Sequence, residues 1–196
     1  MFEQLIPAFI MLFVVMDPFS SIGPFLALTK GFKDEQRVKS ANEAAVVAAL
    51  LMVPFMFFGM SVLSMLGISL ASFKIGGGIV LALLGLQIVL GFSLSKEEKK
   101  PTGTAVAIII ATPMLTGPGV LVTVVFLKQQ YGLPIAILAS LISLSLSWLL
   151  IRNAHRVQRK VGENVIEIFS KIMGLLLVAL AIEFISSGIM MFAKGG

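Results

Sequence analysis

Long runs of apolar residues separated by short polar segments are the dominant pattern in this 196-residue chain. A helix that crosses the hydrocarbon core of a bilayer needs about 20 predominantly apolar residues, and each run is about that long. We place the runs at residues 5–29, 44–66, 73–94, 104–127, 133–151 and 165–192. The pattern predicts an all-α integral membrane protein with six transmembrane segments, of which segments 1 and 4 are broken near mid-membrane.

The two broken segments carry helix-disrupting residues near their centres. Proline lacks the amide hydrogen that a helix uses, and irregular backbone deep in a membrane is tolerated only where it faces protein or a polar cavity. The first break consists of Met16, Asp17, Pro18, Phe19, Ser20, Ser21, Ile22, Gly23 and Pro24. The second consists of Thr112, Pro113, Met114, Leu115, Thr116, Gly117, Pro118 and Gly119. Interrupted segments in corresponding positions point to the binding site of a transporter.

Polar residues between the runs predict where the helices begin and end. Ser40 and Glu43 have the spacing of a capping box, which predicts that the second helix starts there. Pro54 predicts a kink in that helix. We expect a short turn over residues 128–132 and a basic connector over residues 152–160.

Composition supports the membrane assignment. Hydrophobic residues make up 58% of the chain and charged residues 13%, whereas soluble domains average about 45–50% and about 25%. The absence of cysteine excludes disulfides, thiolate metal sites and cysteine nucleophiles. We interpret the net charge of +5 as loop charge rather than as a nucleic-acid-binding surface.

The basic residues are concentrated in alternate connectors, which predicts the orientation of the chain. The connectors after the first, third and fifth segments hold Lys30, Lys33, Arg37, Lys39, Lys96, Lys99, Lys100, Arg152, Arg156, Arg159 and Lys160. The opposite side has only Lys74, Lys128 and Lys194. Because basic loops stay in the cytoplasm, we expect a multi-pass protein of a prokaryotic cytoplasmic (inner) membrane with both termini outside.

The two halves of the chain resemble each other. The matching features are Pro18 with Pro113 at an offset of 95, Gly23-Pro24 with Gly117-Pro118 at 94, and Lys74 with Lys171 at 97. Three segments in each half force the second copy to enter the membrane from the other side, which gives a 3+3 inverted repeat. We therefore expect a single transmembrane domain over residues 1–196, with repeat one at 1–95, a connector at 96–103 and repeat two at 104–196.

A broken helix exposes amides at the start of its second half and carbonyls at the end of its first half. The amide end suits an anion, and Asp17 adds a negative charge that needs a partner at membrane depth. A small zwitterion such as an amino acid matches both. The predicted substrate-binding residues are Asp17, Pro18, Ser20, Ser21, Gly23, Thr112, Pro113, Thr116, Gly117 and Gly119.

Several of these residues have a structural interpretation as well. Asp17 is either a ligand or a cap on freed amides, and Glu43 is either a ligand or the capping-box residue. Glu183 lies within an apolar run and is a third candidate for a coupling ion, with Asp17 and Glu43. Ser140, Ser143 and Ser147 share one helix face and are typical of helix contacts.

The two breaks resemble those of the MarC family of prokaryotic inner-membrane proteins, which includes SnatA-type small neutral amino acid transporters. The likeness covers nearly the whole chain, and its more specific motif is Pro113-Met114-Leu115-Thr116-Gly117-Pro118-Gly119. The first motif departs from the usual spacing between Asp17 and Pro24 and has Ser20 where a glycine is common. The resemblance implies a paired broken-helix core formed by Asp17, Pro18, Gly23, Pro24, Pro113, Gly117, Pro118 and Gly119.

The resulting hypothesis is a secondary transporter that moves glycine, alanine and similar amino acids by alternating access, coupled to H⁺ or Na⁺. A Na⁺ ion near Asp17 is the one metal considered, and no cofactor is expected. The expected partners are the amino acid, the coupling ion and the lipid bilayer, without nucleic acid, and the pattern is compatible with an oligomer. A passive channel or an exporter for another small polar solute is the alternative. An enzyme is not expected because few catalytic groups lie at membrane depth.

Overall fold

The computed structural model describes residues 2–91 and 115–193. All regular secondary structure in these two ranges is helical. The helices are α1 (Phe2–Met16), α2 (Pro18–Leu28), α3 (Asp34–Met65), α4 (Leu70–Leu90), α6 (Pro118–Tyr131), α7 (Leu133–Arg152), α8 (Ala154–Val161) and α9 (Glu163–Ala193). The prediction of an all-α fold is confirmed for this part of the chain.

Five stretches of the described residues are long and apolar enough to cross a membrane: Phe2–Leu28, Asp34–Met65, Leu70–Leu90, Leu133–Arg152 and Glu163–Ala193. They correspond to five of the six predicted segments. The fourth predicted segment is described only from residue 115, where its second half forms the 14-residue helix α6.

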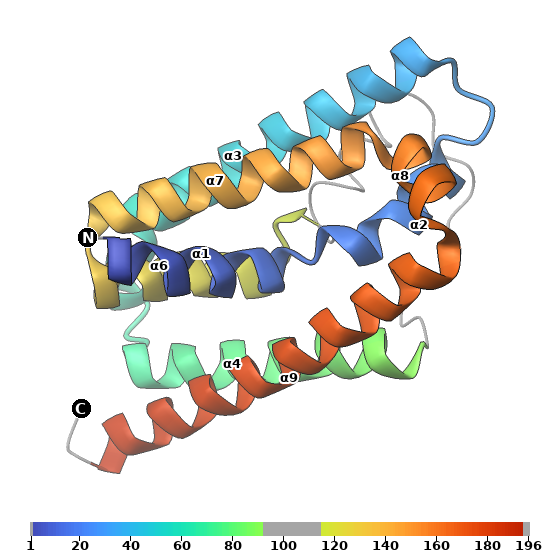
Figure 1. The fold of residues 1–196 in the computed structure, drawn as a ribbon. Coiled ribbons are helices and arrows are strands. Elements are labelled where there is room, and N and C mark those ends of the chain that lie inside the picture. Colours follow the sequence, from blue (N-terminus) through green and yellow to red (C-terminus); the bar gives the residue numbers. More distant parts are fainter. Residues whose placement is uncertain (1, 92–114, 194–196) are drawn as a thin grey trace.

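The helices are arranged in three layers (Figure 1). Helices α3 and α7 form one outer layer and α4 and α9 the other, while α1, α2 and α6 lie between them. The central layer contacts both outer layers, whereas α3 and α4 touch only slightly. The first segment and the described second half of the fourth segment therefore occupy the middle of the molecule, between the two outer layers.

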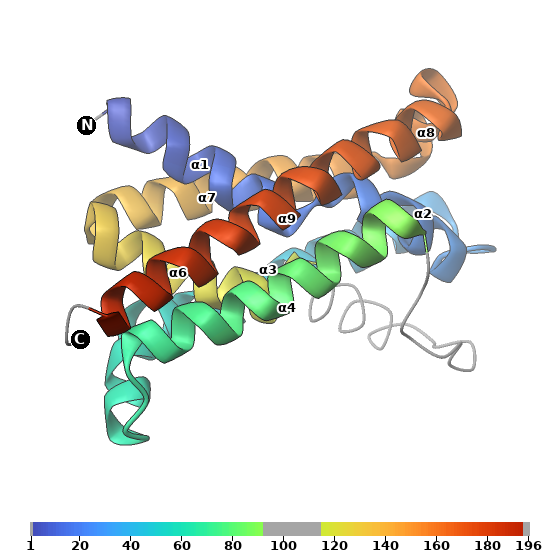
Figure 2. The ribbon, with the colours of Figure 1, turned by 90° about the horizontal axis from the view of Figure 1, so that it is seen from below.

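Helices α4 and α9 run side by side (Figure 2), and glycines form part of their contact. A methyl group at Gly78 would lie 2.8 Å from the carbonyl oxygen of Ala181, and one at Gly85 would lie 2.8 Å from that of Gly174. Such distances leave no room for a side chain. The bare backbones are in direct contact, as small residues permit between membrane helices.

Both termini lie at the same end of the molecule (Figures 1 and 2). The opposite end contains the α2–α3 link, the start of α3 and helix α8. It carries all eight described basic residues of the connectors: Lys30, Lys33, Arg37, Lys39, Arg152, Arg156, Arg159 and Lys160.

Three predicted helix boundaries are wrong: the start of the second helix, the turn at residues 128–132 and the connector at residues 152–160. Helix α3 begins at Asp34, ahead of Ser40, which is buried inside the helix. The Lys33 amide ahead of the helix donates instead to the side-chain Oε1 of Gln36 at 2.9 Å, which is one of the two bonds of a capping box; the lysine ammonium cannot accept the other. Acidic residues in the first turn favour this start because they complement the helix dipole.

The predicted turn at residues 128–132 is helical up to Tyr131, and Gly132 ends the helix with a φ of 82°. The connector at 152–160 is largely helix α8, a short amphipathic helix with Ala154, Val157 and Val161 on one face. The first half of segment 4 and the connector at 96–103 lie outside the described residues, as does Lys194.

Candidate functional site

The break in the first segment is confined to a single residue, Asp17. Its backbone has φ 34° and ψ 69°, a left-handed conformation, and it is the one non-glycine residue with positive φ in the described ranges. The Asp17 amide still donates to the carbonyls of Phe13 and Val14, at 3.1 and 3.2 Å, so it closes α1. Its side chain caps α2, so one residue ends the first helix and begins the second.

Asp17 is buried, and its side chain is only partly satisfied. It is 3% exposed. Oδ1 accepts from the Ser20 amide at 3.3 Å, as an N-cap does. Oδ2 has no hydrogen-bond partner among the described residues. Buried carboxylates without a full set of partners are costly, so this oxygen is the strongest indication of a ligand site in the structure.

The two serines of the break bond to the backbone of Asp17 rather than to its carboxylate. The hydroxyls of Ser20 and Ser21 both donate to the Asp17 carbonyl oxygen, at 3.0 and 3.3 Å. Pro18 is buried at the first position of α2, where its missing amide hydrogen costs nothing. These contacts fix the left-handed turn and leave Oδ2 of Asp17 available.

The start of α6 lies beside the α1–α2 junction (Figure 1). Gly119 is buried, and a methyl group built on it would clash with Leu81 and lie 3.4 Å from Cγ1 of Val15. Thr116 is buried, and Gly117 caps α6. The structure thus brings the described part of the second break to the residues that precede Asp17.

Helix α7 adds polar side chains that the predicted site lacks. The hydroxyl of Ser143 donates to the Phe9 carbonyl at 3.3 Å, which confirms the helix-contact role. Ser147 is fully buried, with its hydroxyl 4.0 Å from the sulfur of Met16, beside the break. The hydroxyl of Ser140 is buried without a partner among the described residues. The i, i+3, i+7 spacing of these serines is the signal that could have placed them at the site.

Other predicted residues lie elsewhere. Gly23 is exposed within α2 and has open space around it. Glu43 is half-buried on α3, 3.9 Å from Lys39 Nζ. Glu183 is exposed on α9, and within the described ranges no hydrogen bond or ion pair joins it to Asp17. Thr112 and Pro113 lie outside the described residues.

Lys74 is buried between helices with 8% exposure. Its Nζ donates to the Ser187 hydroxyl at 2.8 Å and lies 4.5 Å from the centre of the Phe126 ring. Lys74 therefore ties α4 to α9 and α6, and the cation–π contact offsets part of the cost of burying the charge.

Chemically, the junction offers one carboxylate oxygen without a partner among the described residues, next to two serine hydroxyls that are bonded to the Asp17 carbonyl. No group of three His, Cys, Asp or Glu side chains that could hold a metal ion is found within residues 2–91 and 115–193. The arrangement suits reversible binding of a small polar or cationic species.

Comparison with known proteins identifies a family of integral membrane proteins. The family model described as MarC family integral membrane protein matches residues 2–193. A UPF0056 membrane protein of Methanocaldococcus jannaschii is 32% identical, with 95% of this chain and 96% of the relative covered. One of Archaeoglobus fulgidus is 30% identical, with 93% and 90% covered. The UPF0056 inner membrane protein YhgN of Escherichia coli is 27% identical, with 98% and 100% covered.

The comparison with solved structures found no match. A family match over nearly the whole length, together with a relative of more than 30% identity, decides the assignment. The chain belongs to the MarC family of integral membrane proteins.

Proposed function

We propose that this protein is a secondary transporter of small neutral amino acids such as glycine and alanine. The observation that carries the proposal is the buried carboxylate of Asp17, which sits at a helix break beside the start of α6 and keeps one oxygen without a partner among the described residues. In a transporter, a buried carboxylate of this kind binds a cation or the ammonium group of a substrate.

A zwitterion fits the two sides of the junction. Its ammonium group would bond Asp17 Oδ2, and its carboxylate would face the start of α6, where the helix dipole favours negative charge. Gly117 and Gly119 contribute no side-chain bulk. The residues packed around Gly119 leave little space, which favours small substrates.

The inverted repeat is part of the proposal. If α3 corresponds to α7 and α4 to α9, then contacts made by α2 should be mirrored by α6. Helix α2 contacts α7 and α9, and α6 contacts α3 and α4, although α6 also contacts α1 and α7. This exchange of partners supports two related halves. Because α4 and α9 come from different halves but pack closely, the motion that exposes the site alternately would carry these two helices together.

Coupling to H⁺ or Na⁺ would act through Asp17, because it is the one candidate that is buried at the break. A Na⁺ ion there would use Oδ2 and nearby carbonyl oxygens. Glu43 and Glu183 are weaker candidates, since one is near a lysine and the other is exposed. The assignment of both termini to the outside of a prokaryotic inner membrane completes the proposal.

Uptake of labelled glycine into liposomes that contain the purified protein tests this function. We expect uptake that is stimulated by unlabelled glycine inside, and its loss in Asp17→Asn, which keeps the shape and capping ability of the side chain. Ser186→Ala, an exposed change on α9, is the control and should transport normally. Folded wild-type protein without uptake or exchange would refute the proposal.

A passive channel or an exporter for another small polar solute is the alternative. A channel conducts without stimulation by substrate on the far side of the membrane, so the same liposomes distinguish it from a carrier. We infer no catalytic role for Asp17, because the described neighbours supply neither a nucleophile nor a base within hydrogen-bond distance of Oδ2.

A further inference from the structure

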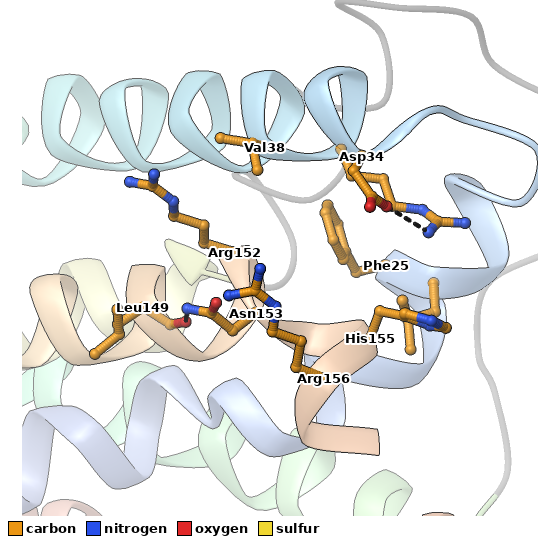
Figure 3. Close-up of a pocket in the computed structure, with 10 residues that line it drawn as sticks. Phe25, Asp34, Val38, Leu149, Arg152, Asn153, His155 and Arg156 are labelled. Carbon is orange, nitrogen blue, oxygen red and sulfur yellow. Dashed lines mark hydrogen bonds and ion pairs between the residues drawn. The ribbon is translucent and has the colours of Figure 1, made fainter. Parts of the chain in front are cut away.

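A pocket of about 370 Å³ opens at the end of the molecule that carries the basic connectors (Figure 3). Its walls come from the end of α2, the start of α3, the end of α7 and helix α8. No residue of the Asp17 junction lines it. The proposed transport function does not use it.

Three arginines from three different helices converge on this pocket. Arg37 comes from α3, Arg152 from the last turn of α7 and Arg156 from α8. His155 also lines it, and Asp34 is the one carboxylate among its lining residues. Figure 3 shows Asp34 and Val38 on one wall and Arg152, Arg156 and His155 on the opposite side of the opening.

These basic side chains make few hydrogen bonds or ion pairs with other described residues. Arg37 Nη1 lies 3.5 Å from Asp34 Oδ1, and Arg37 Nε donates to the Thr29 carbonyl at 3.4 Å. The Arg152 guanidinium lies 5.0 Å from the centre of the Trp148 ring. Within the described ranges, Arg156 has no side-chain hydrogen bond or ion pair. Arg152 and Arg156 therefore line the pocket without a carboxylate partner within hydrogen-bond or ion-pair distance in the described ranges.

We propose that this pocket binds a phosphate group. Guanidinium groups present planar, forked donors that match phosphate oxygens, and three of them around one opening suit an anion that carries several oxygens. A single carboxylate would need only one arginine. The volume of about 370 Å³ leaves room for the group to which the phosphate is attached.

The phosphate can come from an anionic phospholipid or from a soluble phosphate compound. Apolar side chains of Phe25, Val38 and Leu149 line the pocket beside the arginines. Helix α8, with an apolar and a basic face, has the pattern of a helix that lies in the headgroup region. Both features suit a phospholipid headgroup, and the experiment separates this source from a soluble one.

The test measures binding to the full-length protein in a neutral detergent. One arm titrates mixed micelles that contain phosphatidylglycerol, with phosphatidylcholine micelles as reference, and the other titrates inorganic phosphate. The pocket variant is Arg152→Gln with Arg156→Gln. The matched control is Arg159→Gln with Lys160→Gln, which removes the same charge from the same region at residues that do not line the pocket.

We expect the pocket variant to lose about tenfold or more in affinity, because charge-assisted hydrogen bonds are lost. The control should stay within about twofold, since it changes only the diffuse surface potential. Asp34→Asn should tighten binding by about threefold, because it removes the pocket's carboxylate and frees Arg37. A gain of affinity is not expected from a variant that merely damages the fold.

Binding of phosphatidylglycerol alone, or of inorganic phosphate as well, supports the site and identifies the source. Equal losses in the pocket and control variants would show general surface electrostatics and overturn the proposal, as would the absence of binding in both arms. Arg156→Gln alone, at an exposed residue, guards against misfolding of the double variant.

Discussion

Asp17 combines two roles that are usually filled by two residues: it ends one helix and caps the start of the next. A helix commonly ends on a left-handed residue, most often glycine, and the next helix begins with an N-cap such as aspartate. Asp17 adopts the left-handed conformation and also caps α2. Aspartate tolerates this conformation better than most residues, and Pro18 at the first helical position is compatible with an immediate restart.

Substitutions at Asp17 should therefore follow an unusual order of stability. Asp17→Ala loses the cap, at about 0.5–2 kcal/mol, and also holds an alanine in a left-handed conformation, at about 1–2 kcal/mol. Asp17→Gly loses only the cap. We expect the alanine variant to unfold at a lower temperature than the glycine variant, the reverse of their helix propensities. Thermal unfolding in detergent measures this, and a more stable alanine variant would contradict the assigned backbone conformation.

Ser187 gives a second prediction at this scale. Its hydroxyl accepts from the buried Lys74 ammonium at 2.8 Å, and hydrogen bonds to charged groups are worth about 1.5–3 kcal/mol. Ser187→Ala should lower the free energy of unfolding by about that amount. The neighbouring Ser186 is exposed, so Ser186→Ala should change it by no more than about 0.5 kcal/mol. Equal effects of the two changes would show that the Lys74 contact contributes nothing.

The residue scale also shows where sequence reasoning fails. Ser40 and Glu43 have capping-box spacing, but the same spacing is harmless inside a helix, where both side chains find other surroundings. The charged first turn at Asp34 and Glu35 was the better signal. The burial of Lys74 depends on Phe126 and Ser187, which are far from it in sequence.

At the scale of elements, apolar length predicted the helices well because the membrane imposes it. Five segments were found near their expected positions. The ends were harder to predict, since they depend on local competition. Helix α6 continues past Lys128 because no residue stops it before Gly132, which adopts positive φ. The extent of the first break was overestimated because Pro24 is accommodated within α2.

The α4–α9 contact predicts opposite effects for two nearby glycines. Gly76 is exposed and has nothing within 4 Å of an added methyl group. Gly76→Ala should therefore stabilise the folded protein by about 0.4–1 kcal/mol, because alanine gives the unfolded chain less conformational freedom than glycine. At Gly78 the methyl group would meet the Ala181 carbonyl oxygen at 2.8 Å. Gly78→Ala should therefore destabilise by about 1–3 kcal/mol.

Thermal unfolding of both variants in the same detergent gives the comparison. If Gly78→Ala were as stable as Gly76→Ala, the two helices would be farther apart than the structure places them.

At the scale of the whole molecule, the three-layer arrangement cannot be predicted from the sequence of any single segment. The break motifs predicted that segments 1 and 4 would meet, and the described start of α6 does lie beside the α1–α2 junction. The sequence did not predict that α4 and α9 would form one outer layer and α3 and α7 the other. That choice depends on which apolar faces complement each other, and hydropathy does not encode shape.

The location of both termini at one end gives a testable orientation. Because the basic residues gather at the opposite end, we expect that end in the cytoplasm. A fluorescent protein that folds only in the cytoplasm should be dark when fused after Gly196 and bright when fused after Lys160. Alkaline phosphatase fusions at the same two sites should give the reverse pattern. Fluorescence at Gly196 would overturn the orientation.

The direct backbone contact between α4 and α9 has a mechanical consequence. Glycine surfaces have no side chains that could repack, so α4 and α9 would move as one rigid body. The links that precede them in the chain contain Gly67 and Gly162, both with positive φ, where a peptide can swivel with little steric resistance. A swing of this pair against α3 and α7, pivoting at those two glycines, would open the Asp17 junction first to one face of the membrane and then to the other.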